Sequence, residues 1–318
     1  MKPSTREFIH EAKNTQGYSL FDFIHGYIYG RWPYLYISIG IGEHPIRKTF
    51  SPLINLLTRL VNLVKKDNFS TDTSSSSQTQ KITFADTYHG KVLPMEAARQ
   101  LVMVNEAINL QNLEQIIPYQ RARDIILRNP EHIVVLECPC RSARPDPCLP
   151  LDVCLIIGEP FASFVIEHHP RRARWITQQQ AVDIITAENE RGHVHHAFFK
   201  DAMFNRFFAI CNCCSCCCGA MQAHRSGTPM LASSGYVTRK DEGLCEGCGD
   251  CIPFCQFGAL SMNGDTAHVD PNLCMGCGVC NDKCIHGALS LYRDEMKGEP
   301  LEICEFMELP SLKPATKN

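Results

Sequence analysis

Two cysteine runs of the same form, 29 residues apart, constrain this chain more than any other feature. The runs are Leu244–Ser261 (LCEGCGDCIPFCQFGALS) and Leu273–Ser290 (LCMGCGVCNDKCIHGALS), and eleven of their eighteen positions are identical. Each spaces its cysteines as Cys-x2-Cys-x2-Cys-x3-Cys. With 19 cysteines in 318 residues, the chain is too long to be a small scaffold held by disulfides. Thiolates repeated at this spacing therefore predict metal ligation.

The repeated run resembles the motif of bacterial two-cluster ferredoxins. In that family the first three cysteines of a run ligate one 4Fe-4S cluster, and the fourth ligates the other cluster. The resemblance thus implies two interleaved ligand sets, in a small pseudo-twofold ferredoxin-like domain with two 4Fe-4S clusters over residues 236–293. One set is Cys245, Cys248, Cys251 and Cys284, and the other is Cys274, Cys277, Cys280 and Cys255.

The runs depart from the family pattern at one position. The family usually has Pro after the fourth cysteine, whereas this chain has Gln256 and Ile285 there. This departure bears on loop geometry and reduction potential rather than on ligation. Structural zinc is the alternative occupant for a thiolate quartet, but two matched runs of this form favour iron-sulfur clusters.

Ten further cysteines lie upstream, in the segments CPCRSARPDPCLPLDVC and CNCCSCCC, which leaves only Cys304 over. The ten are Cys138, Cys140, Cys148, Cys154, Cys211, Cys213, Cys214, Cys216, Cys217 and Cys218. So many soft ligands predict metal binding by one or more further iron-sulfur clusters, with a dithiol redox site as the alternative. Adjacent cysteines cannot all face one ion, so the sequence leaves their assignment open. The order of these segments resembles an uncharacterised family of Cys-rich 4Fe-4S binding proteins of anaerobic prokaryotes.

Two smaller groups of polar residues are candidate sites. His193 and His195 alternate on a predicted strand and therefore share one face. We expect these histidines at the surface or the core edge, with a metal role as the alternative. The basic cluster at Arg171, Arg172 and Arg174 is expected to be a solvated turn, although it could orient an acidic redox partner.

A polar, Ser/Thr-rich stretch divides the chain. Residues 65–80 (KKDNFSTDTSSSSQTQ) are typical of a flexible linker, which separates an N-terminal arm over 1–64 from a Cys-rich body over 81–235. A C-terminal tail over 294–318 follows the ferredoxin-like domain. Within the arm, Ser51–Val64 has apolar residues on one helical face and predicts an amphipathic helix. We expect it to pack on its own domain, with docking on a membrane or a partner as the alternative.

Local patterns in the body predict an α+β fold. Apolar residues at helical spacing from Pro94 to Ile108 and across Pro118–Asn129 predict two helices. His132–Leu136 (HIVVL) predicts a strand. Thr177–Arg191 is a predicted helix that opens with a capping box and stops at Gly192. Two strands, His193–Phe199 and Arg206–Ile210, are predicted after it, and this order resembles a winged-helix-like unit.

Composition narrows the function and the compartment. A net charge of -3 argues against a nucleic-acid-binding chain. The N-terminus lacks the pattern of a secretory signal, and Asp22, His25 and Arg31 interrupt the apolar stretch Tyr18–Gly42, which argues against a membrane span and leaves peripheral association open. Dense cysteines that stay reduced fit a cytoplasmic protein.

The ferredoxin resemblance implies an iron-sulfur electron-transfer protein or subunit that serves redox protein partners. The alternative is an oxidoreductase in which the upstream cysteines hold a catalytic cluster that the ferredoxin domain supplies with electrons. An electron carrier or redox subunit is favoured over a stand-alone enzyme, because the clusters carry the chemistry. No Gly-rich nucleotide-binding loop occurs in the sequence, and no catalytic residue is assigned.

Overall fold

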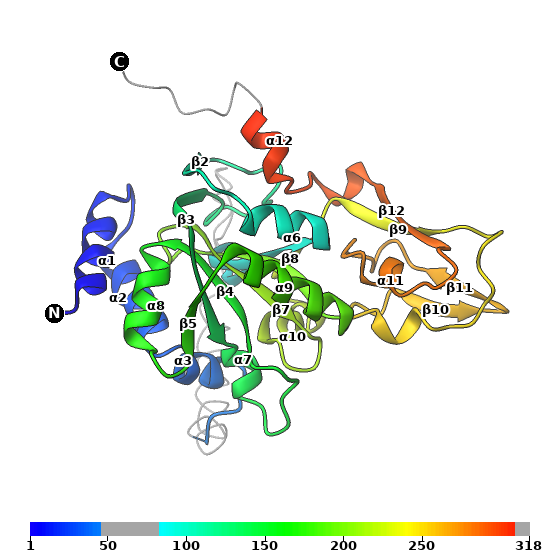
Figure 1. The fold of residues 1–318 in the computed structure, drawn as a ribbon, viewed down its shortest axis with the longest axis horizontal. Helices are drawn as coiled ribbons and strands as arrows, with labels where there is room; N and C mark the ends of the chain where they lie inside the picture. Colours follow the sequence, from blue (N-terminus) through cyan, green and yellow to red (C-terminus); the bar gives the residue numbers. More distant parts are fainter. Residues whose placement is uncertain (46–82, 309–318) are drawn as a thin grey trace, which may run out of the picture.

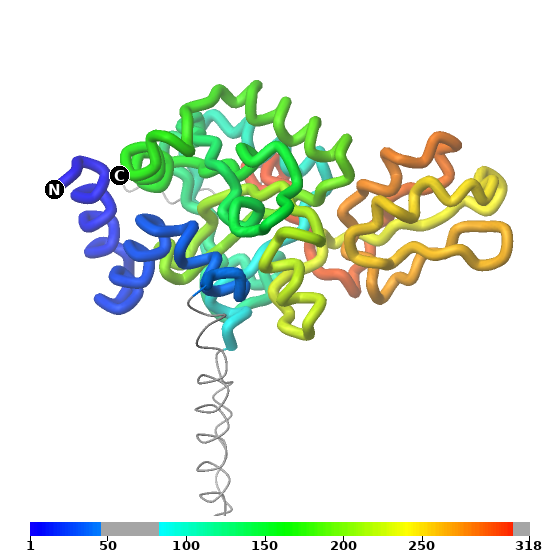
Figure 2. The backbone as a smooth tube through the Cα atoms, turned by 90° about the horizontal axis from the view of Figure 1, so that it is seen from below, coloured from blue at the N-terminus to red at the C-terminus, as the bar shows by residue number. Residues whose placement is uncertain are grey.

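The computed structural model describes residues 1–45 and 83–308. Within these residues the chain forms a body built on one large sheet and, at one end, a smaller cysteine-rich module (Figure 1). The N-terminal helices lie at the opposite end of the body from the module (Figure 2). The helix predicted at Ser51–Val64 and the linker predicted at residues 65–80 lie outside the described residues.

An eight-stranded sheet carries the body. Its strand order is β2-β3-β4-β7-β6-β1-β8, and β5 pairs with β3 outside this path. The pairings are antiparallel except for that of β1 with β8. The strands are β1 (Tyr88–Leu93), β2 (Ile108–Leu110), β3 (Ile125–Glu137), β4 (Asp152–Glu159), β5 (Ala173–Ile176), β6 (Val194–Lys200), β7 (Arg206–Cys213) and β8 (Leu231–Ala232).

Helices cover both faces of this sheet. On one face α6 and α9 pack over a core that includes Leu155 and Phe199, and on the other α1, α2 and α8 pack over a core that includes Val134 and Phe198. The helices are α1 (Pro3–Asn14), α2 (Leu20–Arg31), α3 (Pro33–Gly40), α5 (Phe84–Thr87), α6 (Met95–Val102), α7 (Pro139–Ser142), α8 (Phe161–His168), α9 (Gln178–Glu190), α10 (Gly219–Arg225) and α12 (Ile303–Glu308). This mixture of helices and sheets confirms the α+β class.

The helix α9 and its neighbouring strands form as predicted. The Thr177 hydroxyl accepts from the Gln180 backbone N–H, the Gln180 side chain accepts from the Thr177 N–H, and Gly192 follows the helix at φ +82°. The predicted strand His132–Leu136 lies within β3. The two strands predicted after the helix are β6 and β7. These two strands are neighbours within the eight-stranded sheet, so they belong to a larger unit than the expected winged-helix-like one.

Two predictions before β3 need correction. The predicted helix at Pro118–Asn129 is wrong, because β3 begins at Ile125 and both Ala122 and Asn129 have positive φ. The helix predicted from Pro94 forms as α6 but ends at Val102. Its expected last residue, Ile108, instead begins β2, whose buried residues pair with those of β3. Cross-strand packing thus overrides the local helical spacing.

The N-terminal helices belong to the core of the body. Phe8 of α1 and Tyr29 of α2 are buried in the apolar core on one face of the sheet. The Tyr18 hydroxyl donates to the Ala202 carbonyl at 2.6 Å, and the Tyr34 hydroxyl donates to the Glu137 carbonyl at 2.9 Å. The described part of the predicted arm is therefore packed against the body rather than separate from it.

The outer face of α2 and α3 is apolar. Its exposed large side chains are Leu20, Phe21, Ile24, Ile28, Trp32, Leu35 and Ile39. Across residues 1–45 and 83–308, no helix is both long enough and apolar enough to cross a membrane. Peripheral association with a membrane surface or a partner stays the alternative that the sequence leaves open.

Short elements form the cysteine-rich module. β9 (Tyr236–Lys240) pairs with β12 (Leu289–Arg293), and β10 (Leu260–Asn263) pairs with β11 (Thr266–Val269), both antiparallel. A helical turn precedes the fourth cysteine of each run: η1 (Ile252–Phe254) in the first and α11 (Val279–Asp282) in the second. A further turn, η2 (Glu295–Lys297), follows β12. Each cysteine run therefore lies between two short strands.

The side chain of Gln256 ties the module to the body. Its Oε1 accepts from the Ser215 N–H and its Nε2 donates to the Gly192 carbonyl, both at 2.9 Å. The Asn189 amide donates to Asp282 at 2.7 Å beside these contacts. Gln256 stands where the ferredoxin family usually has Pro, which has no side-chain amide. The departure noted in the sequence is therefore a docking contact.

A buried ion pair joins three elements that lead to the upstream cysteines. Arg141 of α7 and Glu188 of α9 are each 1% exposed, and their side chains meet at 2.6 Å. The same guanidinium donates to the Pro150 carbonyl at 2.6 Å and to the Asn212 carbonyl at 3.0 Å. Arg141 therefore fixes α7, which carries Cys140, against α9 and β7.

We predict that Glu188→Ala lowers the free energy of unfolding by about 3–5 kcal/mol, because it leaves the Arg141 charge buried without its partner. Denaturant titration of the full chain under anaerobic conditions measures this loss. Asp152→Ala is the matched control, since it breaks the exposed Arg174–Asp152 pair at 3.1 Å and should cost under about 1 kcal/mol. Equal losses in the two variants would contradict the structural role of the buried pair.

Candidate metal centres

The first cavity of the module is lined by four thiols. They are Cys245, Cys248, Cys251 and Cys284. Three come from the first run, and the fourth comes from the end of the second run. The cavity encloses about 20 Å³, and Ala267 and Leu289 close it from the flanking strands.

The second cavity repeats this arrangement with the roles of the runs exchanged. Its thiols are Cys274, Cys277, Cys280 and Cys255. It also encloses about 20 Å³, and Phe254, Phe257 and Met275 line it on the side of the body. The structure thus brings together the same two sets of four cysteines that the ferredoxin resemblance groups.

Hydrogen-bond donors approach the sulfurs at equivalent positions of the two runs. The Ala259 N–H donates to Cys255 Sγ at 3.1 Å, and the Ala288 N–H donates to Cys284 Sγ at 3.3 Å. Each donor lies four residues after the fourth cysteine of its run. Donors to sulfur stabilise the thiolate and tune the reduction potential of a bound cluster.

Glycine is required at two equivalent points of the cysteine loops. Gly247 and Gly276 have φ of +68° and +67°. A Cβ on Gly247 would overlap the Asp265 carbonyl, and one on Gly276 would overlap the Tyr236 carbonyl. Backbone lies against the loop at both points, so no side-chain movement relieves the overlap.

We predict that Gly276→Ala lowers the iron content of the purified protein, because the loop that presents Cys274 and Cys277 must move away from the Tyr236 backbone. Iron analysis per chain measures the effect. Gly258→Ala is the control, since Gly258 also has positive φ, +69°, but has open space where a Cβ would stand. Its cost is confined to backbone strain of about 1 kcal/mol, and it should retain its iron. Similar iron loss in both variants would contradict the steric explanation.

Seven of the upstream cysteines line a separate chamber in the body. They are Cys138, Cys140, Cys154, Cys211, Cys213, Cys218 and, at its margin toward a second group of thiols, Cys214. The chamber encloses about 90 Å³, compared with about 20 Å³ for each module cavity. Side-chain interactions link six of these thiols in the order 211, 154, 138, 140, 218 and 213.

The sheet explains why these thiols converge. Cys211 and Cys213 are two residues apart on β7 and therefore face the same side, and Cys154 on β4 is the cross-strand partner of Cys211. Cys138 and Cys140 follow the end of β3, and Cys218 is the residue before α10. The ends of strands and the starts of helices from four parts of the chain thus meet where β3, β4 and β7 begin or end.

Two tyrosines line the chamber beside the thiols. Tyr29 comes from α2 and Tyr88 from the start of β1, and burial raises the pKa of both hydroxyls. The buried ammonium of Lys200 lies 5.0 Å from the Tyr29 ring and 4.9 Å from the Tyr88 ring. Sequence reasoning missed these residues, because no motif links a tyrosine in an N-terminal helix to cysteines more than a hundred residues later.

Burial disfavours the thiolate form of Cys138 and Cys213. The interaction with Cys140 and burial raise the pKa of the Cys138 thiol to about 12. Interaction with Cys218 lowers the pKa of Cys213, but burial outweighs it and raises that pKa to about 12. Several thiolates in one apolar chamber are therefore stable only beside a compensating cation, as a metal or cluster provides.

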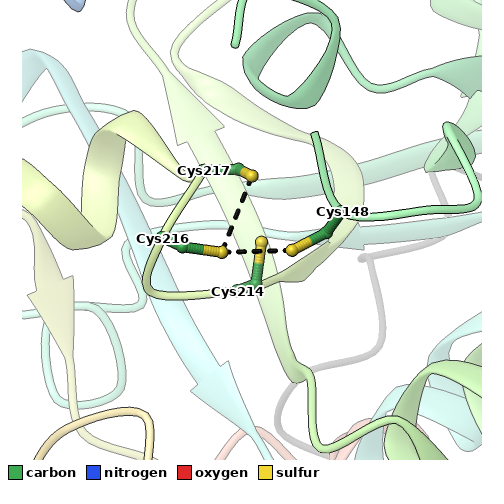
Figure 3. A group of neighbouring side chains, drawn as sticks. All are labelled: Cys148, Cys214, Cys216 and Cys217. Atoms are coloured by element: carbon green, nitrogen blue, oxygen red, sulfur yellow. Dashed lines mark hydrogen bonds between the residues drawn. The ribbon is translucent and has the colours of Figure 1, made fainter. Parts of the chain in front are cut away.

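A second group of four upstream cysteines, called the surface group here, lies next to the chamber and reaches the surface at Cys216 (Figure 3). Its members are Cys148, Cys214, Cys216 and Cys217, of which Cys214 and Cys217 are buried, and their sulfurs all lie within 4.8 Å of one another. Cys148 Sγ lies 3.1 Å from Cys216 Sγ, and Cys216 Sγ lies 3.6 Å from Cys217 Sγ. Burial raises the pKa of Cys216, but hydrogen bonds with the other three thiols outweigh it and hold that pKa below its ordinary value.

The histidines are buried, contrary to the surface or core-edge position expected from the sequence. His195 and His196 are fully buried because β6 lies inside the sheet with helices on both faces. His193 Nδ1 lies 2.6 Å from Glu188, next to Arg141. Burial lowers the pKa of His195 to about 4. Arg171, Arg172 and Arg174 are exposed.

Comparison with known proteins identifies the module. A family model described as a 4Fe-4S dicluster domain matches residues 244–288. This stretch contains all eight cysteines of the two runs. No curated protein matches the chain. The C-terminal part of the chain is therefore a ferredoxin-type 4Fe-4S domain, and with the many other cysteines it indicates iron-sulfur electron transfer.

Proposed function

We propose that the protein relays electrons through two 4Fe-4S clusters in the module and a further iron-sulfur cluster in the chamber of the body. The observation that carries the proposal is the set of four thiols around each module cavity, three from one run and one from the other. Cys₄ ligation is the usual requirement of a 4Fe-4S cluster, so each cavity offers one complete set. When bound, such clusters take up and release single electrons.

The donor set of the module fits these clusters. Its thiols are soft ligands held in apolar surroundings, and burial raises the pKa of Cys280 to about 12. Cluster binding must therefore displace the thiol protons. Donors such as the Ala259 and Ala288 N–H groups remain available to the sulfurs and partly offset their negative charge.

The second cavity of the module is the one next to the body. Cys277 and Val279 pack in one apolar cluster with Val92 of β1 and Val194 of β6. Phe257 and Met275, which line this cavity, also pack against the apolar core that contains the chamber thiols. We therefore order the sites as first cavity, second cavity and chamber, with Phe257 and Met275 excluding water between the last two.

The chamber supports a second candidate function. Seven thiols line it, three more than a 4Fe-4S cluster with ordinary Cys₄ ligation takes, and Tyr29 and Tyr88 line it as well. Spare thiols and hydroxyls beside a cluster are groups that can hold or transfer protons. An oxidoreductase with its catalytic cluster in the chamber, supplied with electrons by the module, is therefore the alternative to a simple relay.

The proposed partners are redox proteins rather than nucleic acids. All 18 cysteines of the three thiol-lined cavities and the surface group are free thiols. Free thiols in this number fit a reducing compartment, and we propose the cytoplasm.

The interleaved ligand sets predict paired losses of cluster signals. Cys255→Ala should remove the same electron paramagnetic resonance signal as Cys277→Ala, because both side chains line the second cavity. Cys284→Ala should remove the same signal as Cys248→Ala, because both line the first. The measurement uses the reduced full chain, purified without oxygen. If the signal lost in Cys255→Ala matched that of Cys248→Ala, the fourth cysteine of each run would serve its own run and the interleaving would be wrong.

The chamber predicts additional iron. The quadruple variant Cys138→Ser, Cys140→Ser, Cys154→Ser, Cys213→Ser should hold about four fewer irons per chain than the unmodified protein, because it leaves fewer chamber thiols than the four that a 4Fe-4S cluster requires. The module signals should remain reducible in this variant. Cys304→Ser is the matched control, since this exposed cysteine lies outside the thiol groups and should leave the iron content unchanged. Equal iron in the quadruple variant and the control would refute a chamber cluster.

A further inference from the structure

We propose that Cys148, Cys214, Cys216 and Cys217 bind a single tetrahedral metal ion, zinc or iron(II), separate from every iron-sulfur cluster. The four sulfurs lie within 4.8 Å of one another, with close pairs at 3.1 Å and 3.6 Å (Figure 3). The sequence grouped these residues with the other upstream cysteines as cluster ligands. Their close spacing distinguishes these four residues as a group, and Cys214, which also lines the chamber, marks where the two groups adjoin.

The distances match one ion rather than a cubane. A metal–sulfur bond of about 2.3 Å in a regular tetrahedron places the sulfurs about 3.8 Å apart. A 4Fe-4S cluster spreads its thiolates over the outer corners of a cube and needs wider spacing. Within residues 1–45 and 83–308, no other three Cys, His, Asp or Glu side chains place their ligand atoms within 4.8 Å of one another. The module and chamber thiols therefore surround larger spaces than this group does.

The ligands come from two loops that an ion would join. Cys148 lies in the loop between α7 and β4, and the other three lie in the loop between β7 and α10. These loops are far apart in sequence and have few residues of their own in the apolar core. An ion held between them would provide the cross-link that a structural Cys₄ zinc site provides in other folds.

The surroundings of the group suit a negatively charged site. Four thiolates around a divalent ion carry a net negative charge, and the Arg144 guanidinium donates to the Cys217 carbonyl at 3.2 Å. Arg144 also pairs with Glu43 at 2.8 Å, and the Gln222 amide donates to the Cys216 carbonyl at 2.7 Å. The loop is therefore held in shape by contacts outside the four sulfurs.

The four thiolate ligands limit the candidate metal ions to zinc and iron(II). A tetrahedral set of four thiolates selects zinc or iron over ions that prefer oxygen ligands. Cys216 is exposed, so an ion reaches the site from solvent without unfolding of the body. This inference does not rest on the proposed electron relay, because the site would be present even if the chamber held no cluster.

The test is the metal content of the full chain purified without oxygen. Cys216→Ser, an exposed position, should lose about one zinc or one iron per chain while the cluster signals stay unchanged. Cys304→Ser, also exposed, is the matched control and should lose none. A loss of about four irons in Cys216→Ser would overturn the single-ion assignment in favour of a cluster.

A measurement on the unmodified protein keeps the proposal testable if the variant misfolds. Zinc K-edge X-ray absorption should show four sulfur ligands at about 2.3 Å, or, with iron, Mössbauer spectroscopy should show one mononuclear iron(II) component beside the clusters. Neither signal, together with a Cys148–Cys216 disulfide found by alkylation and mass spectrometry, would instead identify a dithiol site and refute the proposal.

Discussion

The burial of many thiols beside one another is the constraint on which this architecture depends. A buried thiolate is unfavourable unless a positive charge lies close to it, and two or more in one apolar space repel each other. The high pKa values of Cys138, Cys213 and Cys280 express that cost. The strand ends of the body and the loops of the module nevertheless bring several thiols together in each cavity. Metal binding by these thiols is therefore coupled to the loss of their protons.

The sheet and the module solve the same problem in different ways. In the module, short loops with glycines at positive φ wrap each cavity, and the two runs exchange their fourth cysteines. In the body, side-chain alternation along β7 places Cys211 and Cys213 on the same face, toward the chamber. The buried Arg141–Glu188 pair fixes α7, which also lines the chamber. Rigid elements position the chamber thiols, whereas backbone turns position those of the module. The chamber can therefore be larger and can also admit Tyr29 from α2 and Tyr88 from β1.

The sequence predicted the module better than the body for a physical reason. A run such as Cys-x2-Cys-x2-Cys-x3-Cys ligates within a local loop, so spacing alone indicates its chemistry. The upstream groups depend on tertiary structure. The strand predicted to end at Ile210 continues to Cys213, and only with this extension does alternation place Cys211 and Cys213 on one face. The division of the remaining thiols follows from loop paths that no periodicity encodes, and the Pro118–Asn129 helix failed because β2 pairs with β3.

Gln256 has a consequence for exchanging parts between proteins. It follows Cys255 directly, and its side-chain carbonyl accepts a hydrogen bond from the backbone N–H of Ser215, which lies between two cysteines of the surface group. A ferredoxin unit transplanted into this chain with Pro at this position would keep its cavities but lose this hydrogen bond. Its orientation toward the body would then depend on fewer directional contacts, such as that of Asn189 with Asp282, and on apolar packing, which is less directional. The Gln256 side chain thus makes the module specific to this body, so another ferredoxin unit would not replace it in the same orientation.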